Sequence, residues 1–242
     1  MGPPQAVCPL STPLLFRYSN YRQLLYFFSL QDNYKHIGQR RQLVNTLRKK
    51  GIKDDIVLAA IGQLPRHLFL EKAFEEWAYQ DKPFPIDCEQ TISQPYTVAF
   101  QTSLLEIQKR QKILEVGTGS GYQAAVLSVV GARVFTIERH KPLYLAAKRM
   151  FRMLGLHGVR SYYRDGYKGL AEMAPFDGIL VTAGAPEVPQ ALKDQLKIGG
   201  KLVIPVGKED QRMLRIIRLS KDEWKTEDHG EFRFVPFLPG TA

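Results

Sequence analysis

The chain has 242 residues, of which 44% are hydrophobic and 24% charged, and its formal net charge is +10. These proportions are typical of a globular protein and exclude wholesale disorder. Cys8 and Cys88 are its only cysteines, which excludes a disulfide-rich secreted scaffold and favours a cytoplasmic protein. The length suits one α/β domain with an appendage.

The positive charge has two interpretations. Basic chains often bind RNA, membranes or acidic partners. The densest basic stretch runs from Arg40 to Lys50, and there the basic residues surround Leu43, Val44 and Leu47 at helical spacing. This spacing favours a solvated helix face over a nucleic-acid patch. We therefore expect neither nucleic acid nor a membrane among the partners.

The first 35 residues differ from the rest of the chain. They are rich in aromatic residues without a clear period, and Arg17 and Arg22 interrupt them. No apolar run reaches the roughly 18–20 residues needed to span a bilayer, and the start of the chain lacks the basic residues of a signal peptide. We predict an irregular extension over residues 1–35, dispensable for stability and turnover when deleted up to Tyr34. A helical appendage that includes the segment 91–96 should follow over residues 36–110, and an α/β core over residues 111–242.

The appendage is expected to begin with two helices. The apolar spacing predicts an amphipathic helix from Gln39 to Gly51 and a second helix over residues 56–61, capped by Asp54 or Asp55. The prolines that follow predict a loop over residues 81–89, which cannot be a regular helix.

Beyond Lys112, strands and helices alternate. Strands are predicted at residues 113–116, 133–137, 160–163, 176–181 and 201–206. Helices are predicted at residues 122–130, 142–154 and 189–197, the last closed by Gly199-Gly200, and a final hairpin is predicted to pair residues 213–219 with 232–237. Strands separated by helices predict an α/β fold with a doubly wound, mostly parallel Rossmann-like sheet and helices on both faces. The hairpin predicts an antiparallel edge.

A glycine-rich run, E-V-G-T-G-S-G, links the first of these strands to the first helix. Ligands of open α/β sheets bind at that edge, and glycines let the backbone turn tightly and approach a ligand. The run lacks the G-x-G-x-x-G order of dinucleotide-binding loops, and no P-loop lysine follows, which excludes NTP hydrolysis. We expect cofactor contacts from Gly117, Thr118, Gly119 and Gly121.

Three carboxylates follow the first three strands of this region. Glu115 suits the cationic amino-acid end of S-adenosylmethionine, Glu138 suits ribose hydroxyls, and Asp165 with Gly166 suits the adenine amino group. Singly, each acid also fits a surface charge or a helix cap. Together, around one glycine loop, they resemble the class I S-adenosylmethionine-dependent methyltransferases. The resemblance implies that cofactor, and no metal.

The segment from Thr91 to Tyr96, T-I-S-Q-P-Y, needs a separate explanation. On physical grounds alone it is a turn in which Ser93 caps a helix that has Pro95 in its first turn. It is also similar to the active-site segment of protein-L-isoaspartate O-methyltransferases. The stretches 174–183 and 196–207 are similar to the same family, and the resemblance runs from about residue 36 to residue 239.

This resemblance implies methyl transfer from S-adenosylmethionine to the free carboxylate of L-isoaspartyl residues in damaged proteins and peptides, which initiates repair through a succinimide. It implies Ser93 as the catalytic residue and Thr91, Ser93 and Thr182 as substrate-binding residues. We expect a monomer. One departure from the family is visible, since Asp87-Cys88-Glu89 replaces a glycine-containing approach to the segment. This departure bears on the flexibility of the substrate loop and on peptide preference.

The chemistry needs no general base, because a side-chain carboxylate with a pKa of roughly 4 is already a nucleophile at neutral pH. Ser93 is then a hydrogen-bond donor that orients the carboxylate for in-line displacement, rather than a covalent nucleophile. Two alternatives stay open. The basic charge favours a methyltransferase acting on RNA or a small molecule, and the altered approach loop permits a non-catalytic cofactor-binding homologue.

Overall fold

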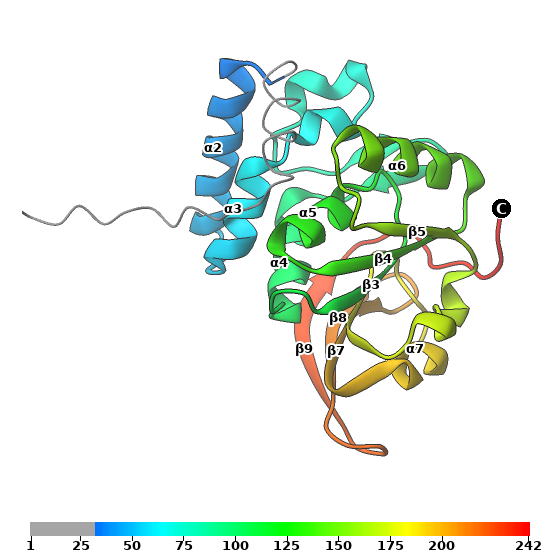
Figure 1. The fold of residues 1–242 in the computed structure, drawn as a ribbon. Helices are drawn as coiled ribbons and strands as arrows, with labels where there is room; N and C mark the ends of the chain where they lie inside the picture. The colour runs from blue at the N-terminus through cyan, green and yellow to red at the C-terminus, as the bar shows by residue number, and fades with distance from the viewer. Residues whose placement is uncertain (1–31) are drawn as a thin grey trace, which may run out of the picture.

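A seven-stranded sheet forms the centre of the molecule (Figure 1). The computed structural model describes residues 32–242, so the predicted extension lies almost wholly outside the described residues. The strands lie in the order β5-β4-β3-β6-β7-β8-β9. The first five are parallel to one another, and β8 pairs antiparallel with both β7 and β9. Their bounds are β3 (Lys112–Val116), β4 (Arg133–Glu138), β5 (Arg160–Tyr163), β6 (Phe176–Val181), β7 (Leu196–Val206), β8 (Gln211–Arg218) and β9 (Trp224–Phe232). The predicted fold class is confirmed.

Helices cover both faces of this sheet, as Figure 1 shows for α5 and α6 on one side and α7 on the other. The bounds are α4 (Pro95–Leu105), α5 (Tyr122–Val130), α6 (Lys141–Met153) and α7 (Gln190–Asp194). Successive strand residues point to opposite faces. Ile113 therefore belongs to one buried apolar cluster and Leu114 to the other.

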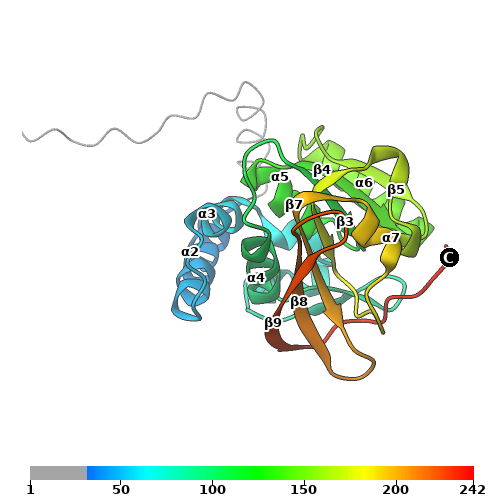
Figure 2. The same cartoon turned by 90° about the horizontal axis from the view of Figure 1, so that it is seen from below.

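The appendage packs outside α4 and α5 (Figures 1 and 2). Its elements are α2 (Tyr34–Lys49), α3 (Asp55–Gln63), the 3-10 helices η1 (Arg66–Phe69) and η2 (Lys72–Trp77), and the two-stranded sheet of β1 (Phe84–Ile86) with β2 (Gln90–Ile92). The helix α2 begins before Gln39 because the side chain of Asn33 accepts the His36 N–H and caps it. Asp54, one of the two predicted residues, caps α3. The predicted loop over residues 81–89 contains β1.

The predicted position of the second strand of the C-terminal hairpin was wrong. The partner of β8 is β9, which ends at Phe232, and a tight turn closes the hairpin where Leu219 N–H donates to the carbonyl of Glu223. Residues 234–237 are all apolar, which favoured a strand there. They lie instead in a C-terminal strap, residues 233–242, which crosses the carboxyl edge of the parallel strands (Figure 2).

The predicted helix over residues 189–197 was too long. The helix α7 ends at Asp194, and Leu196 is already the first residue of β7. Gly199 and Gly200 lie inside β7, where its pairing with β6 is irregular. An ideal Cβ on Gly200 would lie 2.9 Å from the carbonyl oxygen of Lys197. The glycines therefore permit a close backbone approach within a strand and do not cap the helix.

No helix in the described part of the chain is long and apolar enough to cross a membrane. The predicted solvated face of the first helix is confirmed for four of its basic residues, which are exposed: Arg41, Arg48, Lys49 and Lys50. Arg40 is the exception, since it is buried.

Arg40 is held from three directions. Its guanidinium donates to both carboxylate oxygens of Asp32, at 3.1 and 2.6 Å, and to the carbonyl of Gly62 at 2.8 Å. A further bond of 3.1 Å joins it to the hydroxyl of Tyr79. The Arg40 and Asp32 side chains are only 7% and 9% exposed. A deletion up to Tyr34 would remove Asp32 and leave the buried Arg40 guanidinium without its carboxylate. We therefore expect a deletion that includes Asp32 to lower stability, unlike the neutral effect predicted for the extension.

We predict that Asp32→Ala lowers the free energy of unfolding by about 2–4 kcal/mol, because removing one partner leaves a buried charge uncompensated. Urea denaturation measures this directly. The matched control is Glu76→Ala, which removes the partner of exposed Lys35 and should cost less than about 1 kcal/mol. An Asp32→Ala effect no larger than that of the control would contradict the prediction.

Candidate active site

The glycine loop lies where the order of the parallel strands reverses, between β3 and α5. Gly117, Gly119 and Gly121 have φ angles of +101°, +52° and +86°, in the left-handed region that favours glycine. The amides of Gly117 and Thr118 both donate to the carbonyl of Ile137 in β4, at 2.9 and 3.1 Å. The turn is thus attached to the neighbouring strand, with its backbone bordering a pocket.

Thr182 follows β6 and holds the same loop from the other side. Its hydroxyl donates to the carbonyls of Gly117, at 2.7 Å, and Val116, at 3.1 Å. A Cβ on Gly117 would clash with that hydroxyl. Thr182 borders the pocket as expected, but its hydroxyl is already used to fix the loop.

Glu138 ends β4 and is buried at the edge of the pocket. Its Oε2 accepts the N–H of Gly119 at 2.8 Å, and its Oε1 accepts the N–H of His140 at 2.9 Å. Each oxygen keeps further lone-pair capacity. The carboxylate therefore both supports the loop and stands where the sequence analysis expected a ribose ligand.

Glu115, which the sequence analysis expected to favour the cationic end of the cofactor directly or through water, does not border the pocket. Its side chain is fully buried behind the loop, where it accepts a short hydrogen bond from the hydroxyl of Thr136. That hydroxyl pairs in turn with the hydroxyl of Thr118, at 2.6 Å. Glu115 therefore acts on the pocket through Thr136 and Thr118.

Burial raises the pKa of Glu115 to about 8, from an ordinary value of 4.5, because the charged form loses its hydration. The Thr136 hydroxyl and the backbone of Ala124 offset this only in part, and the charge of Glu138 adds to it. At neutral pH the carboxyl is mostly protonated and neutral. A neutral group suits a support for the loop better than an ion partner for a cofactor.

Asp165 and Gly166 are separated by the structure. Gly166 borders the pocket, where a Cβ would lie 2.9 Å from the Phe237 ring. Asp165 borders a neighbouring hollow instead, and its carboxylate accepts the N–H of Tyr167 at the start of a short 3-10 helix. The structure therefore brings the backbone of this pair to the pocket, and not the Asp165 carboxylate.

The C-terminal strap closes the pocket, which the sequence analysis missed. Gly184 N–H donates to the carbonyl of Val235, and Phe237 N–H donates to the carbonyl of Gly184, each at 2.8 Å. The Phe237 ring stacks on Tyr167 at 4.1 Å between centroids. The pocket is bordered by the glycine loop, the ends of β2, β4 and β6 and the strap, through residues that include Thr91, Ile92, Ser93, Val98, Ile137, Arg139, Ala183, Pro236 and Leu238.

Thr91 and Ser93 border the same pocket as the glycine loop. Thr91 lies in β2, and Ser93 follows it. Ser93 is not the cap of α4, since that position belongs to Gln94. The carbonyl of Ser93 accepts a hydrogen bond of 2.9 Å from Arg66. The sequence analysis did not single out Arg66, although an arginine between Pro65 and an apolar run is an unusual core residue.

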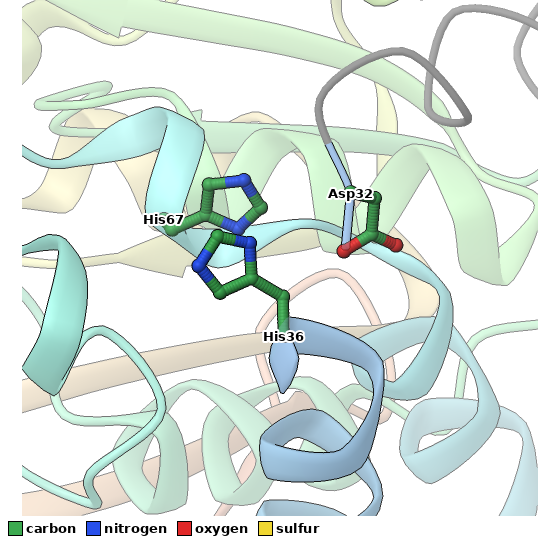
Figure 3. Close-up of side chains that lie close together, drawn as sticks. All are labelled: Asp32, His36 and His67. Carbon is green, nitrogen blue, oxygen red and sulfur yellow. The ribbon is translucent and has the colours of Figure 1, made fainter. Parts of the chain in front are cut away.

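A separate cluster of metal-type ligands lies in the appendage. Asp32, His36 and His67 each place one ligand atom within 4.8 Å of the others (Figure 3). Both Asp32 oxygens, however, accept hydrogen bonds from Arg40, and Nδ1 of His67 lies 2.7 Å from the hydroxyl of Tyr79. The guanidinium already neutralises the carboxylate, so these contacts serve hydrogen bonding within the appendage.

Comparison with known proteins identifies the family. A sequence model described as protein-L-isoaspartate(D-aspartate) O-methyltransferase matches residues 38–241. The chain belongs to this family. The protein-L-isoaspartate O-methyltransferase of Christiangramia forsetii is 57% identical over 209 residues, which cover 86% of this chain and 98% of the relative. That of Flavobacterium johnsoniae is 56% identical with the same coverage.

Solved structures of isoaspartate methyltransferases have the same fold. One protein-L-isoaspartate O-methyltransferase is 31% identical with a TM-score of 0.75, and the match covers 81% of this chain and 65% of that one. A putative enzyme of this name from Plasmodium falciparum, in complex with S-adenosyl-L-homocysteine, is 25% identical with a TM-score of 0.73. That match covers 82% of this chain and 98% of the other.

The departure from the usual isoaspartate methyltransferase sequence falls at the turn between β1 and β2. Cys88 and Glu89 there have φ angles of 60° and 57°. The N–H of Gln90 donates to the carbonyl of Asp87 at 3.3 Å. Cys88 and Glu89 are therefore the central residues of a β-turn with positive φ at both positions, a conformation that glycine adopts without steric cost. This chain keeps the turn with two residues that have side chains. The departure therefore alters the cost of the turn, and the pairing of Ile86 with Gln90 is still formed.

Glu115 yields a prediction for the pH dependence of stability. From about pH 4.5 to about pH 8 the folded state holds a proton that the unfolded chain releases, so the free energy of unfolding falls as the pH rises. Glu115→Gln is neutral at every pH and keeps an acceptor for Thr136. The free energy of unfolding of this variant should fall less steeply with pH than that of the wild type. The two slopes should differ by up to about 1.4 kcal/mol per pH unit. Urea denaturation across this pH range checks the slopes, and parallel curves would refute the raised pKa.

Proposed function

We propose that this protein transfers the methyl group of S-adenosylmethionine to the free carboxylate of L-isoaspartyl residues in damaged proteins and peptides. Family membership and the names of relatives at 54–57% identity support this reaction. The observation that carries the proposal is the position of Ser93. It borders the same pocket as the glycine loop and Glu138.

The pocket fits the methyl donor. Gly117 and Gly119, both with positive φ, expose backbone to it, the Glu138 carboxylate stands at the end of β4, and Gly166 leaves room beside Phe237. Gly117, Thr118 and Gly119 would hold the amino-acid end, Glu138 the ribose, and Gly166 with the adjoining backbone of Asp165 the adenine. Gly121 does not border the pocket and leaves room for the Phe151 ring behind the loop. When bound, S-adenosylmethionine supplies a methyl group on a positively charged sulfur, and its transfer forms an O–CH₃ bond, breaks the S–CH₃ bond and leaves S-adenosylhomocysteine.

The protein's own contribution is orientation. The substrate carboxylate is ionised at neutral pH and needs no base, so the rate depends on holding one of its oxygens in line with the methyl group. Ser93 would donate a hydrogen bond to the other oxygen, and Thr91 would contact the peptide backbone beside it. Phe237 and Leu238 of the strap would keep water from the pocket. The backbone amide nitrogen of the next residue can then attack the ester carbonyl and expel methanol, which closes a succinimide, and water reopens that ring partly to aspartate.

We further propose that the protein works as a cytoplasmic monomer that needs neither nucleic acid nor a membrane. Two cysteines give no disulfide framework, and residues of a single chain border the pocket. Analytical ultracentrifugation with and without isoaspartyl peptide tests the oligomeric state.

The function is tested with matched peptides that contain either an isoaspartyl or an aspartyl residue. We expect methyl transfer to the isoaspartyl peptide alone. Ser93→Ala should lower kcat/KM by roughly 10²–10³, by analogy with loss of one oriented donor in a dry site. Ser93→Thr retains the hydroxyl and should keep more activity. Full activity of the alanine variant would leave Ser93 without a catalytic role, and transfer to RNA in place of the peptide would favour the alternative substrate class.

A second prediction concerns the cofactor. Glu138→Ala should weaken S-adenosylhomocysteine by about 1–3 kcal/mol, because it removes acceptors for buried ribose hydroxyls. Isothermal titration calorimetry measures the affinity. Asp165→Ala is the matched control, since that residue does not border the pocket and its loss should matter less. Unchanged affinity in Glu138→Ala would mean that this residue is not the ribose ligand.

A further inference from the structure

The hydroxyl of Ser93 is not itself held in place. No hydrogen bond joins it to another side chain or backbone group of residues 32–242, and Ser93 lies with Gln94 in the short link between β2 and α4. Its position therefore depends on the backbone that carries it. A donor that must meet a substrate oxygen to within a fraction of an ångström requires that backbone to be fixed.

Arg66 fixes the backbone on one side of Ser93. Its side chain is fully buried, and its Nη2 donates to the Ser93 carbonyl at 2.9 Å. Its Nε donates to the carbonyl of Ala78 at 3.0 Å, and the guanidinium lies 4.8 Å from the ring centroid of Tyr122, the first residue of α5. One cation thus joins the appendage, the Ser93 segment and the helix that follows the glycine loop.

This arginine has an uncommon set of partners. Among the described residues, no carboxylate lies within salt-bridge distance of it. Burial lowers the pKa of Arg66 to about 10, so the group stays charged at neutral pH. Hydrogen bonds from a charged donor to carbonyls are stronger than those between neutral groups. The partners of this buried charge are two carbonyls and one ring, and an apolar residue would fill the same space in the core at a lower free-energy cost. The arginine therefore indicates that the two carbonyls need a hydrogen-bond donor.

Asp81 fixes the backbone on the other side. Its Oδ1 accepts the N–H of Tyr96 at 2.7 Å, and its Oδ2 accepts the side-chain amide of Gln94 at 3.1 Å. Its own carbonyl accepts the same amide at 3.0 Å. The Asp81 side chain is 8% exposed, and Lys50 lies 2.6 Å from its Oδ2. Tyr96 is in the first turn of α4, where a negative charge is favourable.

We propose that Arg66 and Asp81 are positioning residues that clamp residues 93–96 from both ends and thereby aim the Ser93 hydroxyl at the substrate carboxylate. The inference rests on the proposed function of Ser93. It also assigns a task to the appendage, since both residues belong to it and neither borders the pocket. The cofactor side is affected only through the ring of Tyr122.

The test is a double-mutant cycle with Arg66→Lys and Ser93→Ala. A lysine has one ammonium and cannot bond both carbonyls in the arginine's fork geometry. The contact with Ser93 is to its backbone, so Ser93→Ala keeps the contact and removes only the hydroxyl that is aimed. In the protein that retains Ser93, we expect Arg66→Lys to lower kcat by about 10²-fold. In the Ser93→Ala background, the same substitution should have almost no effect on kcat. The affinity for S-adenosylhomocysteine should stay close to that of the wild type.

The matched control is Arg40→Lys, the same substitution at another buried arginine of the appendage that contacts Gly62 and Asp32 but not Ser93. It should lower the melting temperature and leave kcat unchanged, with both substrates saturating and the assay well below the lowest melting temperature. Asp81→Asn, which retains one acceptor, should keep more of kcat than Asp81→Ala. That comparison decides the matter if Arg66→Lys does not fold.

Several results would overturn the proposal. Equal losses from Arg66→Lys in both backgrounds would mean that it acts on the fold or the cofactor, and an equal loss in Arg40→Lys would mean that any weakening of the appendage lowers kcat. Unchanged kcat in Arg66→Lys, or equal activity of the two Asp81 variants, would exclude a positioning role. Failure of the proposed function looks different, because the wild type would then not methylate the isoaspartyl peptide or Ser93→Ala would be fully active.

Discussion

The carbonyl oxygen of Ile137 accepts two hydrogen bonds, from Gly117 and Thr118, and the arrangement of the whole pocket depends on them. They attach the start of the glycine loop to the end of β4, so the turn into α5 cannot move independently of the sheet. The next residue of β4, Glu138, takes the N–H of Gly119. One strand end therefore sets the position of three successive loop amides. Because the sheet edge is rigid, the backbone that would meet the cofactor is rigid as well.

The layer beneath the loop explains why an acid is buried there. Glu115, Thr136 and Thr118 form a line of hydrogen-bonded side chains from the centre of β3 to the pocket. An apolar residue at position 115 would leave the Thr136 hydroxyl with one partner fewer, and a buried polar group without a partner costs more than the bond itself contributes. Because its pKa is raised, Glu115 is mostly protonated at neutral pH, and the protein avoids most of the free-energy cost of burying a charge. The acid is thus a neutral support, and charge interactions at the pocket are left to Glu138.

The sequence predicted correctly the elements whose own residues carry the apolar pattern of a strand or a helix. It failed for elements whose bounds depend on contacts with distant parts of the chain. The strands β3, β4 and β6 are rich in buried apolar residues, and their bounds were predicted to within a residue. Residues 234–237 are apolar and were therefore assigned to a strand, but the turn at Leu219 brings β9 in earlier and leaves them to the strap. Gly199-Gly200 has the composition of a helix end, and only the close approach to the Lys197 carbonyl explains it. Local composition cannot separate these cases.

The site shows the same division. Chain order alone places Glu138 and the glycines at one sheet edge, because parallel strands end together. It cannot tell that Glu115 faces away from the pocket while Gly166 faces it, since that depends on side-chain direction within a strand end. Nor does any local signal reveal the roles of two arginines that lie 26 positions apart in the printed sequence. Arg40 meets a carboxylate and binds the start of α2 to α3, which is a structural use of charge. Arg66 meets the carbonyls of Ala78 and Ser93, and under the positioning role proposed for it the burial of this charge serves the alignment that in-line transfer requires.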